Sequence, residues 1–396
     1  MDDLDDLLKE VEGLESPQKG PMPSSQPSKP VAQPPQPVAQ PPAAVPSSLA
    51  GANQSKTLEG SKDFEAEIDG LLDGLDDTPT PSPAAHKAAS AAASQPLPQG
   101  GGFSDSLCTG VWLGSAEEQG NRPSMEDRFI AKERFFPPNI SGKLGSTRAL
   151  CGVFDGHSSA MVAQFASTRL PEMMERESWY KDPKRSESDS IKKSLEETFV
   201  RLDEEILAMT AQGDLGGGAT ANVALLLDGW LHVANLGDAR AVLSRGGRAM
   251  PLSVDHKPDA EAERMRIENA NGKVEWRGCW RVMTSNGGNP RGLAVSRAFG
   301  DMDWKVPHAL VESTPDVMSV ELNGRDEFVI VGCDGVWDVL QNQDAVDIAR
   351  RHLSGMRKES GGDVAAAAAA QQIASHALGL GSMDNVTVVV MAFLWA

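Results

Sequence analysis

Apolar runs alternate with stretches of helical periodicity from about residue 108 to the C-terminus. Leu150–Phe154 is apolar or glycine throughout and is followed by Asp155–His157, which predicts a buried strand that ends in a turn. Phe328–Cys333 repeats this pattern directly before Asp334. Ile191–Gln212 places apolar side chains three or four positions apart, so it predicts a long helix.

Other runs predict hairpins and further helices. Asp228-Gly229 separates two apolar runs, the pattern of a two-residue β-hairpin turn. Ser158 is placed to cap the next helix, which Pro171 is expected to kink or break. Val254–Gly300 reads as irregular apart from one helix. Hairpins together with long helices favour antiparallel sheets with helices packed outside. The remaining expected strands are Val111–Ser115, Thr220–Leu227, Trp230–Leu236, Ala241–Ser244 and Val386–Phe393, and the remaining expected helices are Ala160–Arg176, Ala260–Asn269, Asp344–Met356 and Val364–Leu378.

Residues 1–102 have a different composition. They are rich in Pro, Gln, Ser and Ala, and such a segment buries too little apolar surface to fold, so a disordered tail is expected. Met1–Leu14 and Phe64–Leu75 interrupt it with acidic amphipathic helix patterns that resemble the LD motif of paxillin-type adaptors, with Val11 and Ile68 as departures. Both suit the groove of a docking partner. Residues 103–396 are expected to form the folded domain.

Charge and cysteine usage narrow the function classes. The formal net charge of -19 and the pI of about 4.8 argue against a nucleic-acid or anionic-membrane partner. The 4 cysteines form no CxxC pair, and Cys151 and Cys333 lie inside apolar runs, so these two are expected to be buried thiols and the compartment to be reducing. The N-terminus is acidic and no apolar run is long enough to cross a bilayer. We therefore expect a soluble intracellular protein, cytoplasmic or nuclear, with no membrane insertion.

Acidic residues recur where the apolar strands stop. Each of them taken alone is more typical of a solvated turn, but so many turns at strand ends are improbable by chance. If the strands pack side by side, their ends converge and the carboxylates share one cleft. Divalent cations would remove the resulting repulsion, and two of them are typical of phosphoester hydrolysis. The acids in question are Glu126, Asp127, Asp155, Asp238, Asp334 and Asp384.

Eight motifs in a fixed order resemble those of the metal-dependent serine/threonine protein phosphatases of the PPM, or type 2C, family. The resemblance covers Cys108 to the C-terminus, and its specificity comes from the complete ordered set rather than from any single motif. It implies a four-layer αββα sandwich of two antiparallel sheets flanked by helices, in the α+β class. The motifs are Asn121–Asp127, Val153–His157, Gly218–Ala221, Ala234–Arg240, Asp255–Pro258, Leu293–Asp301, Cys333–Asp338 and Gly381–Asn385.

The resemblance assigns roles to individual residues. It implies two Mg²⁺ or Mn²⁺ ions bridged by Asp155, with the carbonyl of Gly156 on one ion and Asp334 and Asp384 as further direct ligands. Glu126 and Asp127 are expected to hold metal-bound waters, and Asp238 and Asp338 to bind a weaker third ion. Arg122 resembles the phosphate clamp, and His157 resembles the general acid that protonates the leaving oxygen.

Several residues near these motifs have structural interpretations. His256 is expected in a turn, Arg297 in an ion pair within the fold, and Trp276 and Trp280 in packing of a flap formed by Val254–Gly300. Two departures from the family pattern are Ser158, where glycine usually follows the histidine, and Ala219, where serine is common. The length of the flap leaves the substrate preference open.

The resulting hypothesis is a monomeric Mg²⁺/Mn²⁺-dependent phosphatase in which metal-bound hydroxide directly attacks phosphoserine or phosphothreonine of phosphoprotein substrates. A catalytically silent phosphoprotein-binding module of the same fold is the alternative. A metal-dependent nuclease is a third interpretation, which the acidic composition disfavours.

Overall fold

Two five-stranded antiparallel sheets pack against each other in the part of the chain that the structure describes. The structure is a computed structural model and describes residues 107–137, 147–181, 188–284, 291–354 and 361–396. The predicted tail and its two amphipathic segments lie outside the described residues. In spatial order, the first sheet contains β1 (Cys108–Glu118), β16 (Val386–Trp395), β15 (Asp326–Gly332), β8 (Arg240–Arg245) and β9 (Arg248–Pro251), and the second contains β14 (Asp316–Glu321), β7 (Trp230–Leu236), β6 (Ala221–Leu227), β3 (Arg148–Phe154) and β2 (Arg128–Lys132).

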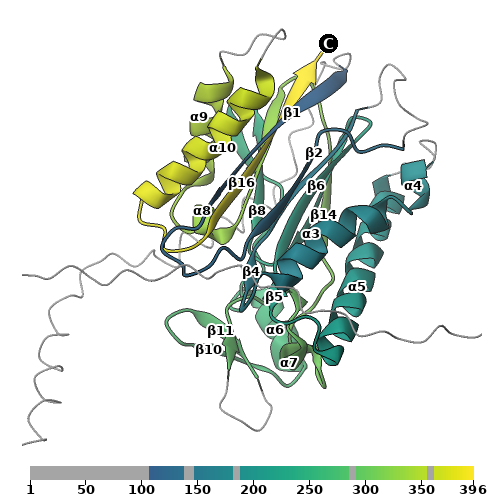
Figure 1. The fold of residues 1–396 in the computed structure, drawn as a ribbon, viewed down its shortest axis with the longest axis vertical. Helices are drawn as coiled ribbons and strands as arrows, with labels where there is room; N and C mark the ends of the chain where they lie inside the picture. Colours follow the sequence, from purple (N-terminus) through teal and green to yellow (C-terminus); the bar gives the residue numbers. More distant parts are fainter. Residues whose placement is uncertain (1–106, 138–146, 182–187, 285–290, 355–360) are drawn as a thin grey trace, which may run out of the picture. The chain divides into compact units, whose positions relative to one another are not determined.

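Helices cover the outer face of each sheet (Figure 1). One pair lies over the first sheet and another pair over the second, so the expected α+β sandwich of four layers is confirmed. None of the helices in the described segments combines the length and apolar character that a bilayer crossing requires. The helices of the sandwich are α9 (Asn342–Leu353) and α10 (Gly362–Gly379) on the first sheet, α3 (Met161–Met174), α4 (Ser178–Lys181) and α5 (Ser188–Gln212) on the side of the second, and the short α8 (Asp334–Trp337) after β15.

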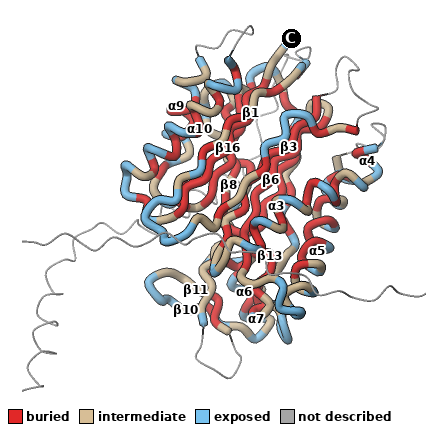
Figure 2. Tube along the Cα trace, viewed as in Figure 1, coloured by how far each residue is buried: buried red, intermediate tan, exposed pale blue. Residues whose placement is uncertain are grey.

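The uninterrupted apolar run in β3 reflects burial on both faces of the second sheet. Ala149, Cys151 and Val153 belong to the core between the sheets, whereas Leu150 and Phe154 belong to the core beneath the helices. Because successive side chains of a strand point to opposite faces, a strand between two apolar layers is apolar along the stretch that both layers cover, here Ala149–Phe154. Figure 2 shows this buried centre, with most of the exposed positions in the helices, the loops and the edge strands.

The predicted β6–β7 hairpin is present, and its turn explains the Asp-Gly pair. Asp228 and Gly229 have φ angles of 50° and 91°, the left-handed conformation that a two-residue turn of this kind requires. Arg148, which is fully buried, pairs with Asp228 at 2.7 Å. The turn is thereby anchored to the adjacent strand β3.

Two local predictions about α3 were wrong. The helix continues through Pro171 to Met174, because the amide of Glu175 bonds to the Pro171 carbonyl and the last turn closes without the missing N–H. Ser158 does not cap the helix. It has a φ of 66°, and the hydroxyl of Ser159 instead accepts the Met161 amide at 3.1 Å.

The segment expected to be an irregular flap has a small sheet and core of its own. Its core contains Ile267, Val282 and Trp304. The alternation of apolar and polar residues in the two hairpin strands was too short to predict them. Its elements are α6 (Glu261–Asn269), β10 (Lys273–Trp276), β11 (Trp280–Met283) and β12 (Gly292–Leu293). The helix α7 (Met302–Lys305) follows the segment and adds Trp304 to its core.

An ion-pair network centred on the buried carboxylate of Glu263 joins the flap to the sandwich. Arg297 pairs with Glu263 at 2.6 Å and with Asp316 of β14 at 2.9 Å, which fits the expectation that it pairs within the fold. Arg266 also pairs with Glu263, at 3.0 Å. Although burial opposes ionisation of Glu263, these arginines hold its pKa down at about 2.

The glycine at position 114 sets how closely α10 approaches the first sheet. A β-carbon on Gly114 would overlap the backbone of Ala366 and Ala367 in this alanine-rich helix. We expect Gly114→Ala to lower the free energy of unfolding by about 1–3 kcal/mol or more, since the helix must shift. Gly379→Ala, where nothing lies within 4 Å, is the matched control and should be neutral or stabilise by up to about 1 kcal/mol. Urea unfolding midpoints compare the two, and equal effects would contradict this close packing.

Removing the negative charge of Glu263 in the flap should destabilise the fold in a pH-dependent manner. Glu263→Gln removes the carboxylate that Arg297 and Arg266 share, while Arg297 keeps Asp316 and Arg266 keeps Glu312, so a loss of about 1–3 kcal/mol is expected at pH 7. The pKa of Glu263 is lower in the folded state than in the unfolded state, so its contribution is complete above about pH 4.5 and is lost as the pH falls toward 2. Thermal unfolding from pH 7 to pH 3.5 should show the difference between wild type and variant shrinking below pH 4.5. A difference that stays constant would contradict this assignment.

Candidate active site

The predicted convergence of carboxylates at the strand ends is present. One carboxylate oxygen each from Asp155, Asp238 and Asp334 lies within 4.8 Å of the other two. Asp127, Asp155 and the sulfur of Cys333 form a second such group. Asp155 belongs to both and is therefore the centre of the cluster. The acids come from the ends of different strands, with Asp155 after β3, Asp238 after β7, Asp334 after β15, Asp127 before β2 and Asp384 before β16.

Several of these oxygens are held away from water without a hydrogen-bond donor. Both carboxylate oxygens of Asp127 and Oδ1 of Asp334 are buried without a partner among the described residues. Loss of hydration raises the pKa of Asp127 to about 6 and the pKa values of Asp155 and Asp334 well above the ordinary range, and neighbouring acids add to this. Such oxygens suit a hard divalent cation, which would supply the missing positive charge.

Cys333 lies in the cluster as a neutral thiol. Burial raises its pKa well above the ordinary value, and nearby carboxylates add to that shift. The thiol donates to the Asn385 carbonyl at 3.4 Å, and its sulfur accepts the Thr387 amide at 3.1 Å. This agrees with the buried structural thiol expected from the sequence. Oxygen-preferring cations would be held by the carboxylates around it.

Asn385 fixes the loop that carries the first acidic motif. Its side-chain amide donates to the carbonyls of Gln119 and Ser124 at 2.8 and 3.0 Å, and its oxygen accepts the Glu126 amide at 2.8 Å. Three hydrogen bonds from one side chain thus place Glu126 and Asp127 against the end of β16.

Gly156 lies where the chain passes this loop most closely. A β-carbon there would overlap the Glu126 carbonyl, so only glycine permits this approach. Glu126 itself accepts a hydrogen bond from the Ser124 hydroxyl at 3.1 Å.

Arg122 lies at the rim of the cluster. Its guanidinium is 2.5 Å from Oδ2 of Asp384, and 53% of its side chain is exposed. The exposed position beside the acids is compatible with binding a phosphoryl group that enters from solvent.

Lys257 places a positive charge inside the cluster, which the sequence did not predict. Its ammonium lies 2.6 Å from Asp238 and 3.9 Å from Asp338, the pair expected to bind a third ion. Burial opposes the charge on Lys257, but Asp238, Asp338 and Asp334 outweigh this and raise its pKa. A cation between Asp238 and Asp338 would therefore have to displace the ammonium.

His157 pairs with a carboxylate outside the cluster. Its Nε2 lies 2.8 Å from Oδ2 of Asp301, which is buried. Burial alone would lower the pKa of His157, but Asp301, assisted by Asp238 and Glu126, raises it. The sequence did not single out Asp301. It is the last residue of the Leu293–Asp301 motif, but the resemblance gave a role to no residue of that motif in the site.

Two flap residues have the structural roles that the sequence favoured. His256 is buried, accepts the Gly237 amide on Nδ1 at 3.1 Å and lies 3.2 Å from Asp316 through Nε2. Trp276 contacts Trp280 edge to face with ring centroids 5.6 Å apart. Trp276 is nevertheless 61% exposed, so its packing is one-sided.

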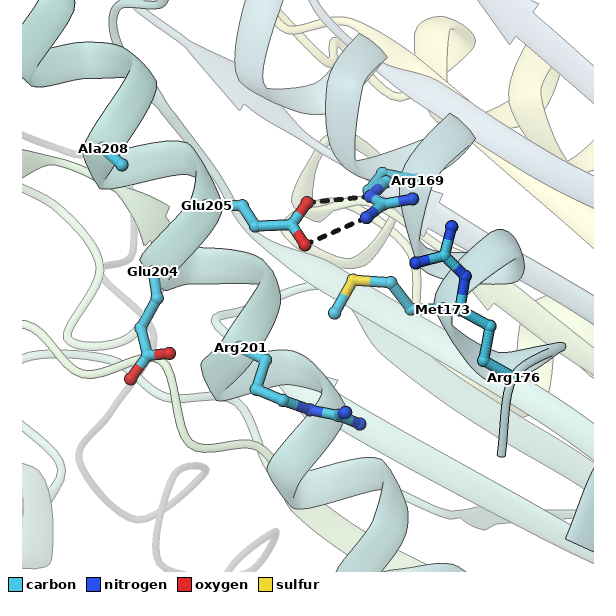
Figure 3. Close-up of a pocket in the computed structure, with 7 residues that line it drawn as sticks. All are labelled: Arg169, Met173, Arg176, Arg201, Glu204, Glu205 and Ala208. Carbon is cyan, nitrogen blue, oxygen red and sulfur yellow. Dashed lines mark hydrogen bonds and ion pairs between the residues drawn. The ribbon is translucent and has the colours of Figure 1, made fainter. Parts of the chain in front are cut away.

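A separate hollow lies in the helical layer between α3 and α5 (Figure 3). Its arginines are balanced by carboxylates, because Arg169 pairs with Glu205 at 2.8 Å and Arg201 pairs with Glu177 at 2.6 Å. None of the residues that line it belongs to the acid cluster. The lining residues are Arg169, Met173, Arg176, Arg201, Glu204, Glu205 and Ala208.

Comparison with known proteins identifies related sequences. The family profile of protein phosphatase 2C matches residues 112–386. Probable protein phosphatase 2C 59 of Oryza sativa subsp. japonica is 39% identical over 296 residues, which are 74% of this chain and 79% of that protein. Probable protein phosphatase 2C 11 of Arabidopsis thaliana is 38% identical over 282 residues, which are 71% of this chain and 66% of that protein.

Solved structures share the fold. The serine-threonine phosphatase 2C from Toxoplasma gondii superposes with a TM-score of 0.61 at 23% identity, covering 73% of this chain and 98% of that one. A Caenorhabditis elegans sex determining protein gives a TM-score of 0.58 at 26% identity, covering 72% of this chain and 65% of that one.

The crowding of acids predicts that the metal-free protein is destabilised by its own site. In EDTA, Asp155→Asn should unfold at a higher temperature than wild type, because it removes one charge from the centre of the cluster. With Mn²⁺ added, wild type should melt at the higher temperature, because it binds the ions more tightly than Asp155→Asn and is stabilised more by them. Differential scanning calorimetry measures both, with Asp214→Asn at an exposed position as the control. A lower melting temperature of Asp155→Asn in EDTA would contradict mutual repulsion.

Proposed function

The chain belongs to the protein phosphatase 2C family and is a protein serine/threonine phosphatase, and we propose that its acid cluster binds two Mg²⁺ or Mn²⁺ ions for the reaction. The buried, partnerless oxygens of Asp127 and Asp334 around Asp155 carry this proposal. Such oxygens are costly to bury unless a cation meets them. The same cluster disfavours the alternative of a catalytically silent phosphoprotein-binding module, because each acid expected of an active family member is present.

The assignment of ligands follows the family resemblance, and the grouping of Asp155 with Asp334 supports it. Asp155, Asp334, Asp384 and the Gly156 carbonyl would hold the two ions directly. Glu126 and Asp127 would orient water molecules bound to the ions. When bound, the ions would polarise the phosphoryl group and activate a water molecule for in-line attack on phosphorus.

The protein groups around the ions would bind the substrate and move the proton. Arg122 at the rim would hold two phosphoryl oxygens through its planar guanidinium. His157 would donate a proton to the serine or threonine oxygen as its bond to phosphorus breaks. No cysteine nucleophile is required, consistent with the neutral buried thiol of Cys333.

A third ion at Asp238 and Asp338 would bind weakly in this proposal. Lys257 already neutralises this pair, at 2.6 Å from Asp238, so binding of the ion includes the cost of displacing the ammonium. The proposed substrates are phosphoproteins, and we propose a monomer that acts in the cytoplasm or nucleus. The four free cysteines fit a reducing compartment. A nuclease is disfavoured by the net charge of -19.

The full-length protein should release phosphate from phosphoserine and phosphothreonine peptides in Mn²⁺ or Mg²⁺ and lose this activity in EDTA. Asp155→Asn should lower kcat by at least about 10³-fold, because the ions contribute several kcal/mol to the transition state. Asp214→Asn is the exposed control and should match wild type. Malachite-green detection of released phosphate compares wild type with metal, wild type in EDTA and the two variants.

Two outcomes would contradict the proposal. Activity that is unaffected by EDTA, or retained by Asp155→Asn, would exclude the cluster as the metal centre. A folded wild-type protein that binds the phosphopeptides without turnover would instead support the silent binding module.

A further inference from the structure

We propose that Asp301 is a positioning residue for the phosphatase reaction, because it holds the His157 ring in the orientation that delivers a proton from Nδ1. This inference rests on the proposed role of His157 as general acid and adds the residue that orients it. The central observation is the contact between Nε2 of His157 and Oδ2 of Asp301 at 2.8 Å, made by residues 144 positions apart in the chain.

A three-stranded sheet of two-residue strands brings the pair together. In spatial order it contains β13 (Phe299–Gly300), β5 (Gly218–Ala219) and β4 (Gly156–His157). His157 and Gly300 both pair with Gly218, from opposite sides. Neighbouring strands lie about 4.8 Å apart, so His157 and the end of β13 are separated by roughly twice that distance. Side chains that lean across β5 can span it.

Gly218 leaves the space that this bridge needs. A β-carbon on Gly218 would overlap both Oδ2 of Asp301 and Nε2 of His157. The two side chains therefore meet directly above the one backbone position between them that carries no side chain. Only glycine at position 218 leaves room for the contact between His157 and Asp301, so this contact is part of the folded structure.

The backbone segment that carries Asp301 is held by several hydrogen bonds. Its backbone amide donates to the Gly217 carbonyl at 3.1 Å. The preceding Gly300 amide donates to Asp203 of α5 at 2.8 Å, and Asp203 pairs with Lys305 at 2.5 Å. Both members of that pair are more than nine-tenths buried. The long helix α5 thus fixes the segment that presents Asp301.

Asp301 also adopts an unfavourable backbone conformation. Its φ and ψ angles are 52° and 46°, in the left-handed region that costs a non-glycine residue about 1–2 kcal/mol. Its side chain is 4% exposed. Asp301 thus combines a strained backbone with a buried polar side chain, and this side chain contacts His157. Strained residues of this kind cluster at functional sites.

The orientation assigns the proton to one ring nitrogen. When both ring nitrogens of His157 carry protons, Nε2–H donates to Asp301, so Nδ1–H is the proton left for the substrate. As the phosphorus–oxygen bond to serine or threonine breaks and a new one forms to water, the leaving oxygen takes the Nδ1 proton. A proton from the consumed water restores the imidazolium, and Asp301 acts only by holding the ring.

Leaving groups that differ in their need for a proton test this role. Asp301→Asn keeps the size of the side chain but loses the charge. It should lower kcat for a phosphoserine peptide by about 10²-fold, because a serine alkoxide leaves poorly without a proton. It should lower kcat for p-nitrophenyl phosphate by less than about threefold, because p-nitrophenolate is a stable anion. Asp303→Asn, two residues away and exposed, is the matched control and should match wild type on both substrates.

Two further variants separate a positioning role from a structural one. Gly218→Ala retains both side chains but forces them apart, so it should show the same selective loss on the phosphopeptide. A double variant of Asp301→Asn with His157→Gln should lose no more activity than His157→Gln alone, because Asp301 acts through the ring. Circular dichroism and melting temperature establish that each variant is folded.

The result that overturns the inference is an equal loss on both substrates in Asp301→Asn, an unchanged phosphopeptide rate, or additive losses in the double variant. Failure of the proposed general acid is distinguishable. In that case His157→Gln itself would show no dependence on the leaving group, and the inference about Asp301 would fall with it. Loss of the phosphopeptide rate in His157→Gln without any in Asp301→Asn would overturn the inference about Asp301 alone.

Discussion

Mutual repulsion among buried carboxylates is the constraint on which the site depends. Two unit charges 4 Å apart repel by about 4 kcal/mol at an effective dielectric constant of 20, and Asp155 faces several such neighbours. The acids come from the ends of strands in both sheets, so the packing of the two sheets brings them together. The repulsion lowers the stability of the fold, but it also makes the cluster a binding site for cations. A cation bound there would relieve the repulsion and would also stabilise the charge that develops during phosphoryl transfer.

The protein also supplies fixed groups that organise the space around that charge. Lys257 neutralises one side of the cluster, and Asn385 fixes the loop of the first acidic motif through three hydrogen bonds. His157 is directed by Asp301 across the gap above Gly218. These contacts come from segments that are distant in sequence, so the geometry of the site is set by the packing of the sandwich and the flap rather than by any one motif.

The sequence predicted what depends on local pattern. The two-sided burial of β3 was visible as an unbroken apolar run, and the Asp228-Gly229 turn as a hairpin signal. The acids were found because each follows or precedes a strand. Lys257 and Asp301 lie in quoted motifs but were given no role, because their partners Asp238 and His157 are distant in sequence and the contacts depend on packing. Pro171 misled because its effect depends on how near it lies to the end of the helix.

Anomalous diffraction from crystals of the full-length protein soaked in Mn²⁺ tests the central claim most directly. The predicted result is two manganese peaks, both within coordination distance of the Asp155 carboxylate, with Asp334 and Asp384 as further ligands. Peaks confined to other acidic surfaces, with the carboxylates around Asp155 uncoordinated at saturating Mn²⁺, would contradict the claim that these side chains converge to bind metal.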